Sequence, residues 1–175
     1  MKYRVYITIL LLIFVFPPIV DAEIYYVTKE GNDENSGSAW DDSFLTITRA
    51  MEEVGSGDSV WVAEGTYTEE DTITAPEDVA LYGGFSGEEN KLSERNVDMY
   101  NTIIHGLGRH RCFNNSGVIS GFSITKGYTE EDGGGIWSES KSALIEDCKI
   151  YNNISDQRSA PQKLDNRLRW RYKPY

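Results

Sequence analysis

Three consecutive acidic residues form a candidate metal-ligand cluster. Glu130, Glu131 and Asp132 stand directly before Gly133 and offer the hard carboxylate oxygens that calcium prefers. Consecutive acids beside a glycine are also typical of a solvated turn, and both interpretations stay open. Calcium is the one cofactor that the sequence suggests, because neither cysteine has a second ligand at zinc-finger spacing.

A second candidate site brings together the only two histidines of the chain. His105 and His110 flank the segment Gly106-Leu107-Gly108-Arg109, and an imidazole next to an arginine could supply acid–base chemistry. The pattern matches no complete motif. A turn in which the histidines are held by their neighbours is the alternative.

Two tryptophans are candidates for contact with sugars. In Ser59–Ala63 the residues alternate, so that Val60 and Val62 share one side and Trp61 takes the other. If Ile136 likewise points inward, Trp137 points outward. Flat apolar rings on an outer surface can stack on sugar faces, which would make Trp61 and Trp137 a carbohydrate-binding pair. Coverage of both rings by loops or by a partner is the alternative.

Length and charge limit the classes of protein. The 175 residues include 28 acidic and 17 basic ones, for a net charge of -11, and provide for one or two domains. This excess of acid argues against a nucleic-acid binder. Residues 23–153 hold 25 acids and 9 bases, whereas residues 154–175 hold six bases and two acids. The basic tail is interpreted either as an interaction arm or as the altered end of a fragment of a longer protein.

The N-terminus has the pattern of a secretory signal peptide. Lys2 and Arg4 precede an apolar run over 5–16, and small or short residues lead to an expected cleavage after Ala22. The run is shorter than the ~20 residues that cross a bilayer, so we expect no membrane span after cleavage. The protein is therefore expected outside the cell or at the cell envelope. There, Cys112 and Cys148 could pair, or each could pack as a free thiol.

Local patterns predict strands, one short helix and turns. Ile24–Val27 is rich in β-prone residues, and residues 31–38 consist of turn residues. Thr46 can cap a helix in which Ile47, Ala50, Met51 and Val54 share one face, before Gly55 ends it. We expect this helix to cover the N-terminal end of the core.

Hydrophobic spacing predicts a repeating architecture. The apolar anchors lie 21, 22, 21 and 26 residues apart, in the order Val60, Leu81, Ile103, Ile124, Ile150. A shift of 26 residues places the segment 118–127 on 144–153, with apolar residues matched at 118/144, 119/145, 122/148 and 124/150. Strands joined by turns too short for crossover helices favour a solenoid. A small antiparallel sandwich is the alternative.

Several segments resemble the N-terminal module of secreted pectin-lyase-like proteins. They are Gly31-Asn32-Asp33 with Ser36-Gly37, Phe44-Leu45-Thr46-Ile47, Gly57-Asp58-Ser59-Val60 and Val62-Ala63-Glu64-Gly65-Thr66-Tyr67. Leu81–Gly87 and Asn101–Gly106 resemble the following coils in bacterial surface proteins of this type, including polymorphic outer-membrane protein-like chains. The resemblance covers residues 24–153. It implies a right-handed parallel β-helix, export, and association with polysaccharide binding or cleavage.

The resemblance also indicates which chemistry to look for. Lyases of this fold use calcium to acidify a uronate and an arginine or lysine as base, and the available bases are Arg95, Arg109, Arg111 and Lys126. Hydrolases of this fold use several aspartates, for which Asp41-Asp42 and Asp147 are the candidates. No spacing joins either set into one site.

The sequence therefore predicts an all-β protein, a right-handed parallel β-helix with a short N-terminal capping helix. The expected parts are a signal peptide over 1–22, a cap over 23–58, coils over 59–153 and a basic tail over 154–175. The expected function is recognition or processing of a polysaccharide or cell-surface glycan, with binding favoured over catalysis. An active lyase or hydrolase and a structural adhesin are the alternatives.

Overall fold

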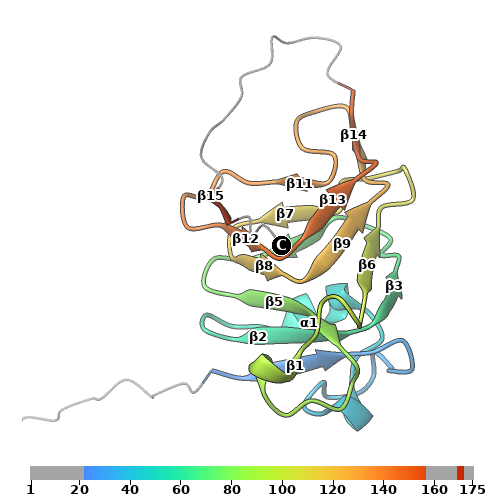
Figure 1. The fold of residues 1–175 in the computed structure, drawn as a ribbon, viewed down its shortest axis with the longest axis vertical. Coiled ribbons are helices and arrows are strands. Elements are labelled where there is room, and N and C mark those ends of the chain that lie inside the picture. The colour runs from blue at the N-terminus through green and yellow to red at the C-terminus, as the bar shows by residue number, and fades with distance from the viewer. Residues whose placement is uncertain (1–21, 157–168, 172–175) are drawn as a thin grey trace, which may run out of the picture.

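The chain winds into a parallel β-helix. The computed structural model describes residues 22–156 and 169–171, which form short strands joined by turns and loops (Figure 1). The expected signal peptide lies outside the described residues except for Ala22. All strand pairs of the described chain are parallel, which rules out the antiparallel sandwich. The predicted all-β solenoid is confirmed.

Three parallel sheets run along the coil. Sheet A contains β1 (Ile24–Val27), β2 (Ser59–Ala63), β5 (Ala80–Phe85), β8 (Val118–Ser120), β12 (Leu144–Glu146) and β15 (Arg169–Arg171). Sheet B contains β3 (Gly65–Tyr67), β6 (Thr102–His105), β9 (Phe122–Thr125) and β13 (Lys149–Tyr151). Sheet C contains β4 (Ile73–Ala75), β7 (Phe113–Asn115) and β11 (Ile136–Trp137). A separate pair joins β10 (Tyr128–Thr129) to β14 (Ile154–Ser155).

The predicted shift of 26 residues is the register of the last full coil. Leu144 pairs with Val118 and Ile145 with Ile119 in sheet A, while Ile150 pairs with Ile124 in sheet B. Inward residues therefore stack on inward residues. Each coil buries its apolar side chains against its neighbours, as in other solenoids.

The predicted spacing is wrong around Ile103. Leu81 pairs with Ile119 in sheet A, so this coil is 38 residues long. Ile103 belongs to sheet B, where it is half-exposed and its neighbour Ile104 is buried instead. The extra length comes from a long excursion between β5 and β6. The interval of 22 residues from Leu81 to Ile103 therefore connects residues of two different sheets, because Leu81 lies in sheet A and Ile103 in sheet B.

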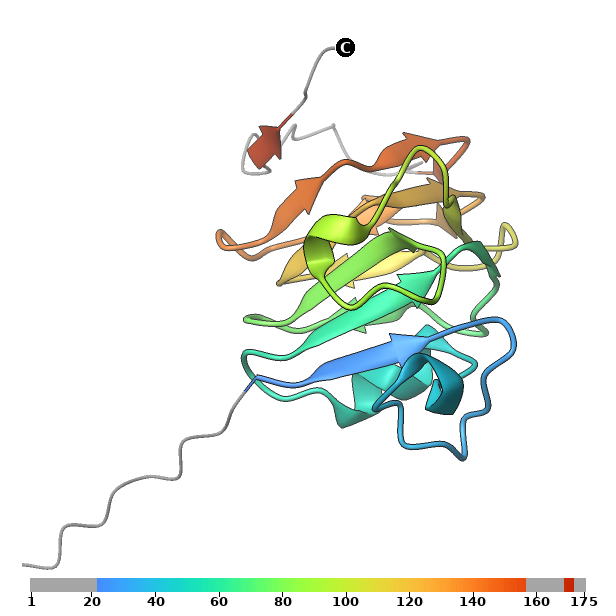
Figure 2. The same cartoon turned by 60° about the horizontal axis from the view of Figure 1, so that its bottom comes forward.

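The excursion, here called the 86–101 loop, lies over the outer face of sheet A (Figure 2). It contains the 3₁₀ turn η2 (Leu92–Glu94). The indole nitrogen of Trp40, in the 3₁₀ turn η1 (Trp40–Asp42), donates a hydrogen bond of 2.8 Å to the carbonyl oxygen of Glu89. The amide of Asn96 donates to the carbonyl oxygen of Gly84 at 2.7 Å. These bonds hold the loop against the sheet.

The predicted helix is α1 (Ile47–Glu53). The hydroxyl of Thr46 accepts a hydrogen bond of 3.1 Å from the amide of Arg49, as expected of an N-cap. Ile47 and Ala50 are fully buried. The helix packs against β1, β2 and β4. The helix covers the N-terminal end of the core next to β4. Without it, the edge strands at this end of the coil would be exposed to water.

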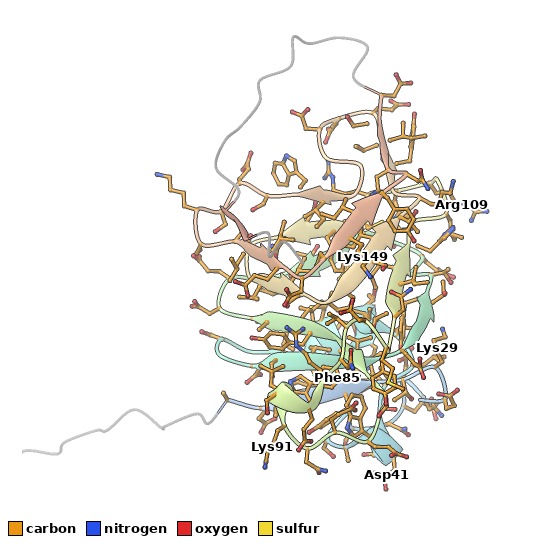
Figure 3. The ribbon with its side chains drawn as sticks, in the orientation of Figure 1. Lys29, Asp41, Phe85, Lys91, Arg109 and Lys149 are labelled. Carbon is orange, nitrogen blue, oxygen red and sulfur yellow. The ribbon has the colours of Figure 1, made fainter. Side chains whose placement is uncertain are left out.

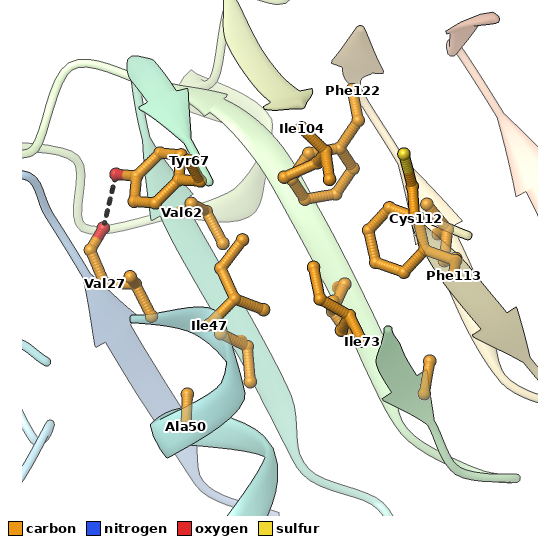
Figure 4. Packing of buried hydrophobic residues seen from close by; sticks show 14 of the residues in the cluster. Val27, Ile47, Ala50, Val62, Tyr67, Ile73, Ile104, Cys112, Phe113 and Phe122 are labelled. Carbon is orange, nitrogen blue, oxygen red and sulfur yellow. Dashed lines mark hydrogen bonds between the residues drawn. The ribbon is translucent and has the colours of Figure 1, made fainter. Parts of the chain in front are cut away.

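The core is a continuous stack of apolar side chains inside the coil (Figure 4). Val27, Ile47 and Val62 lie in its N-terminal part, and Phe113 and Phe122 lie further along. Tyr67 is also buried, and its hydroxyl donates to the carbonyl oxygen of Ala63 at 3.1 Å. This hydrogen bond satisfies a polar group that burial would otherwise penalise.

Strand pairing extends beyond the expected end of the coils at Asn153. Ile154–Ser155 pairs with Tyr128–Thr129, and Arg169–Arg171 pairs with Leu144–Glu146 in sheet A. The part of the tail that the structure describes therefore continues the sheets. The rest of the tail lies outside the described residues.

Candidate functional site

The outer surface of sheet C carries a ladder of polar and aromatic residues. Thr74, Asn114 and Trp137 occupy equivalent positions in β4, β7 and β11, since Thr74 pairs with Asn114 and Asn114 with Trp137. Their neighbours Ile73 and Phe113 are buried, and Ile136 packs against the core. Trp137 therefore points outward, as predicted, and is half-buried. We call this ladder together with Arg111 the sheet C face.

Arg111 fixes the loop that borders this face. Its Nε donates to the carbonyl oxygen of Gly133 at 2.9 Å, and Nη2 donates to that of Asp132 at 2.6 Å. Nη2 also lies 3.6 Å from the carboxylate of Glu131. The guanidinium stands over the Trp137 ring, 5.4 Å from its centroid, within the range of a cation–π interaction. The guanidinium of Arg111 therefore holds the loop before β11 and also packs against the ring of Trp137.

The same arginine sets the orientation of Asn114. Nη1 of Arg111 donates to Oδ1 of Asn114 at 2.9 Å. An arginine has no acceptor, so the amide oxygen of Asn114 must face the guanidinium and its NH₂ group must face away. The sheet C face consequently presents hydrogen-bond donors beside an aromatic ring. Sequence reasoning missed Thr74 and Asn114, because Phe113-Asn114-Asn115 has no clear strand signal.

Trp61 does not share this exposure. Its side chain does lie outside the coil interior, opposite Val60 and Val62, but it is only 4% exposed. Phe85 stacks on its ring and Tyr26 packs edge-on against it. The prediction that Trp61 presents a ring to sugars is wrong, because the alternation showed the side of the strand but not the rings of Tyr26 and Phe85 that cover Trp61.

The predicted calcium ligands do not converge. Glu130, Glu131 and Asp132 are exposed. Throughout the part of the chain that the structure describes, no group of three or more His, Cys, Asp or Glu side chains could hold a metal ion. The segment instead contributes a main-chain carbonyl and a carboxylate to Arg111. The segment 130–132 is therefore a solvent-exposed turn that contacts Arg111, which was the alternative interpretation of these acidic residues.

The other candidate bases are dispersed. Arg95 lies over sheet A, where Nη2 donates to the hydroxyl of Ser120 at 2.8 Å and lies 3.4 Å from the carboxylate of Asp147. Arg109 and Lys126 are exposed, and Figure 3 shows Arg109 projecting from the turn between β6 and β7. Arg95 and Asp147 therefore act as a clamp between the 86–101 loop and the sheet, and the four cations do not form one site.

The aspartates and histidines proposed from sequence also have structural partners. Asp42 accepts hydrogen bonds from the amide and hydroxyl of Ser36, and Asp41 is exposed in η1. His105 accepts from the amide of Leu107 at 3.1 Å. The ring of His110 contacts two main-chain carbonyl oxygens. None of these contacts joins an aspartate to a histidine.

Several acidic side chains accept hydrogen bonds from main-chain amides. The carboxylate of Glu69 accepts from the amides of Ile47 and Thr48 at the start of α1. Asp58 accepts from the amides of Glu23 and Gly55. Both side chains are buried, as is Glu89. Buried carboxylates of this kind satisfy amide groups that have no strand or helix partner.

Both cysteines are free. Cys112 is buried and Cys148 is half-buried, and burial raises the pKa of each thiol to about 11. Of the two roles left open by the sequence, the structure shows packing. No helix in the described part of the chain combines the length and hydrophobicity needed to cross a membrane.

Comparison with known proteins agrees with this architecture. The fold defines the class: a parallel β-helix with an aromatic and donor-rich outer face. The chain belongs to the family described as "Protein of unknown function (DUF1565)", which matches residues 29–159. No curated protein matches. Among solved structures, a rhamnogalacturonan lyase is similar, with a TM-score of 0.53 and 16% identity over 77% of this chain.

The similarity to the lyase is one of fold. The matched region is 37% of the lyase chain, so the present chain spans well under half the length of that relative. The pectin-lyase-like β-helix expected from the sequence is thereby supported. At this identity a shared fold carries no shared chemistry, because one fold hosts many unrelated functions.

Proposed function

We propose that this protein recognises glycans through the sheet C face. The observation that carries the proposal is the position of Trp137, half-exposed on the outer surface with the guanidinium of Arg111 over its ring and the oriented amide of Asn114 on the neighbouring strand. The carbon–hydrogen faces of sugars stack on aromatic rings, and their oxygens accept hydrogen bonds from such donors. The similar fold belongs to a protein named rhamnogalacturonan lyase, and for this reason we choose polysaccharides as the ligands to test.

Binding is favoured over cleavage. Arg95 and Arg111, the two candidate bases with the most contacts, use their guanidinium groups to hold main-chain carbonyl oxygens, hydroxyl groups and carboxylates. These structural contacts occupy the N–H groups of both guanidinium groups. The sheet C face is better suited to hold a chain than to break it.

We also propose that the protein works outside the cell. The support is the pattern of Lys2 and Arg4 followed by an apolar run that ends before Ala22. Expression of the full-length chain followed by N-terminal sequencing of the exported protein tests this. A mature N-terminus at Glu23 is expected, and retention of the uncleaved chain in the cell contradicts it.

Glycan retention by the full-length chain and two variants tests the main proposal. Immobilised pectic and neutral polysaccharides are suitable probes. Trp137→Ala should weaken retention roughly tenfold, which corresponds to about 1.4 kcal/mol. Tyr151→Ala removes an aromatic ring that is 45% exposed on sheet B, and it should leave retention unchanged.

The outcomes separate the competing functions. Retention without new chain ends supports glycan recognition. Release of shortened chains identifies an enzyme instead. Failure to bind any acidic or neutral glycan overturns the proposal and favours a structural surface protein. Equal retention by Trp137→Ala and the unchanged protein removes Trp137 from the site.

A further inference from the structure

His110 lies at a corner where three consecutive coils meet. Its Nδ1 lies 2.8 Å from the carbonyl oxygen of Arg111, and its Nε2 lies 3.1 Å from the carbonyl oxygen of Glu69 in the preceding coil. The carbonyl oxygen of His110 accepts a hydrogen bond of 2.8 Å from the amide of Tyr128 in the following coil. One half-buried residue thus links the turns that lead to β4 and β7 with the segment that contains β10.

The two ring contacts have a chemical requirement. A carbonyl oxygen only accepts hydrogen bonds, so each contact needs an N–H group on the ring. A neutral imidazole has one such group, whereas an imidazolium has two. We propose that His110 is a proton-dependent clasp: the charged ring donates to Arg111 and to Glu69, and loss of the proton releases one of these bonds.

The charged neighbours of the clasp are turned toward other partners. The carboxylate of Glu69 faces the first amides of α1, and the guanidinium of Arg111 faces the loop before β11. The remaining titratable or charged residues in the segments that meet here are Glu70, Asp71, Arg109, Cys112, Lys126, Tyr128 and Glu130. The contacts of the His110 ring nitrogens are the two carbonyl oxygens of Arg111 and Glu69.

His105 has the opposite arrangement and serves as an internal control. Its Nδ1 accepts a hydrogen bond from the amide of Leu107, which requires a lone pair on that nitrogen. Proton binding breaks this contact but completes the contacts of His110.

Nitrogen NMR of both rings in the full-length chain tests the clasp directly. Titration from about pH 5.5 to about pH 8 covers the range in which histidines change charge. We expect both nitrogens of His110 to carry protons at a pH where Nδ1 of His105 carries none. Over the same titration we also follow hydrogen exchange of the Tyr128 amide, corrected for the intrinsic rate at each pH. Its protection factor should fall about threefold to tenfold, because one hydrogen bond contributes about that factor to an equilibrium constant.

Two variants test whether His110 causes the change in Tyr128 protection. His110→Gln has an NH₂ group that does not titrate, so protection of Tyr128 should no longer depend on pH. His105→Gln should keep the decrease. A neutral His110 ring that retains both contacts overturns the proposal, and so does an equal loss of protection in His110→Gln and the unchanged protein.

One consequence rests on the proposed glycan function. Because Arg111 follows His110 directly, opening of the clasp at higher pH should weaken glycan retention in the unchanged protein but not in His110→Gln. The NMR result stands without any glycan. Failure to retain any glycan at any pH contradicts the proposed function alone, whereas retention that does not change with pH contradicts the coupling between the clasp and the sheet C face.

Discussion

The rings of Trp61 and Phe85 stack with their centroids 4.7 Å apart and their planes 10° from parallel, on the outside of sheet A. Trp40 packs against Phe85 and against Tyr26, and Tyr26 packs against Trp61. These four residues form an outer aromatic cluster, separate from the core inside the coil. It attaches the N-terminal loops and the 86–101 loop to the sheet.

Trp61→Ala should destabilise the fold by about 3–5 kcal/mol, because it removes a large buried ring and leaves a cavity. Urea unfolding followed by circular dichroism measures this loss. Trp137→Ala is the matched control, and since Trp137 is half-exposed we expect a change below about 1 kcal/mol. A loss in Trp61→Ala as small as the one expected for Trp137→Ala would mean that the outer aromatic cluster does not support the fold.

Arg111→Lys should also lower stability, by about 1–3 kcal/mol. A lysine ammonium cannot donate in one plane to Asn114 and to the carbonyl oxygens of Gly133 and Asp132, so these partly buried or exposed acceptors lose their partners. Thermal unfolding gives the magnitude. The exposed Arg109→Lys should behave like the unchanged protein, and a stable Arg111→Lys would show that the loop holds itself in place.

Glu89 makes a contribution to stability that depends on pH. Burial favours its neutral form, but hydrogen bonds from the amides of Ser86, Gly87 and Glu88 outweigh this, and the pKa falls below its ordinary value of 4.5. A carboxylate with a lowered pKa stabilises the folded state above its unfolded pKa and loses this effect as pH falls through the folded one.

Glu89→Gln should therefore be less stable than the unchanged protein at neutral pH. The difference should shrink once the pH falls below 4.5 and the natural carboxylate takes up its proton. Urea midpoints measured at several pH values test this. A difference that stays constant down to acid pH would show that the charge of Glu89 is not what matters.

The thiols of Cys112 and Cys148 should be unreactive in the folded protein. Burial raises the pKa of each to about 11, and only the thiolate reacts. At pH 8 we expect alkylation, followed by mass spectrometry, to be slower than in denaturant by roughly two orders of magnitude. Stability that depends on a reducing agent would instead indicate that the two cysteines pair.

Elements defined by short-range patterns were predicted well. Thr46, Ile47 and Ala50 carry both the cap and the buried face of α1, and these signals lie within one turn of helix. The 26-residue shift identified the partners in β8 and β12 because the same apolar pattern occurs in both segments at that distance. The length of the preceding coil was predicted wrongly, because the 86–101 loop adds residues to it and no local sequence pattern indicates how many.

The candidate site was predicted only in part. Alternation along Ser59–Ala63 and Ile136–Trp137 is enough to place Trp61 and Trp137 outside the coil. It cannot show that Phe85 and Tyr26 cover the first ring, nor that Arg111 stands over the second.

The sequence by itself determined the capping helix, the repeat of the last full coil and the inward side of strands such as Ser59–Ala63, because hydrophobic spacing and helix capping act between near neighbours. Only the tertiary structure decided which tryptophan remains accessible and which cation meets it. Those relations join residues from different coils, and the lengths and paths of the intervening loops set their distances.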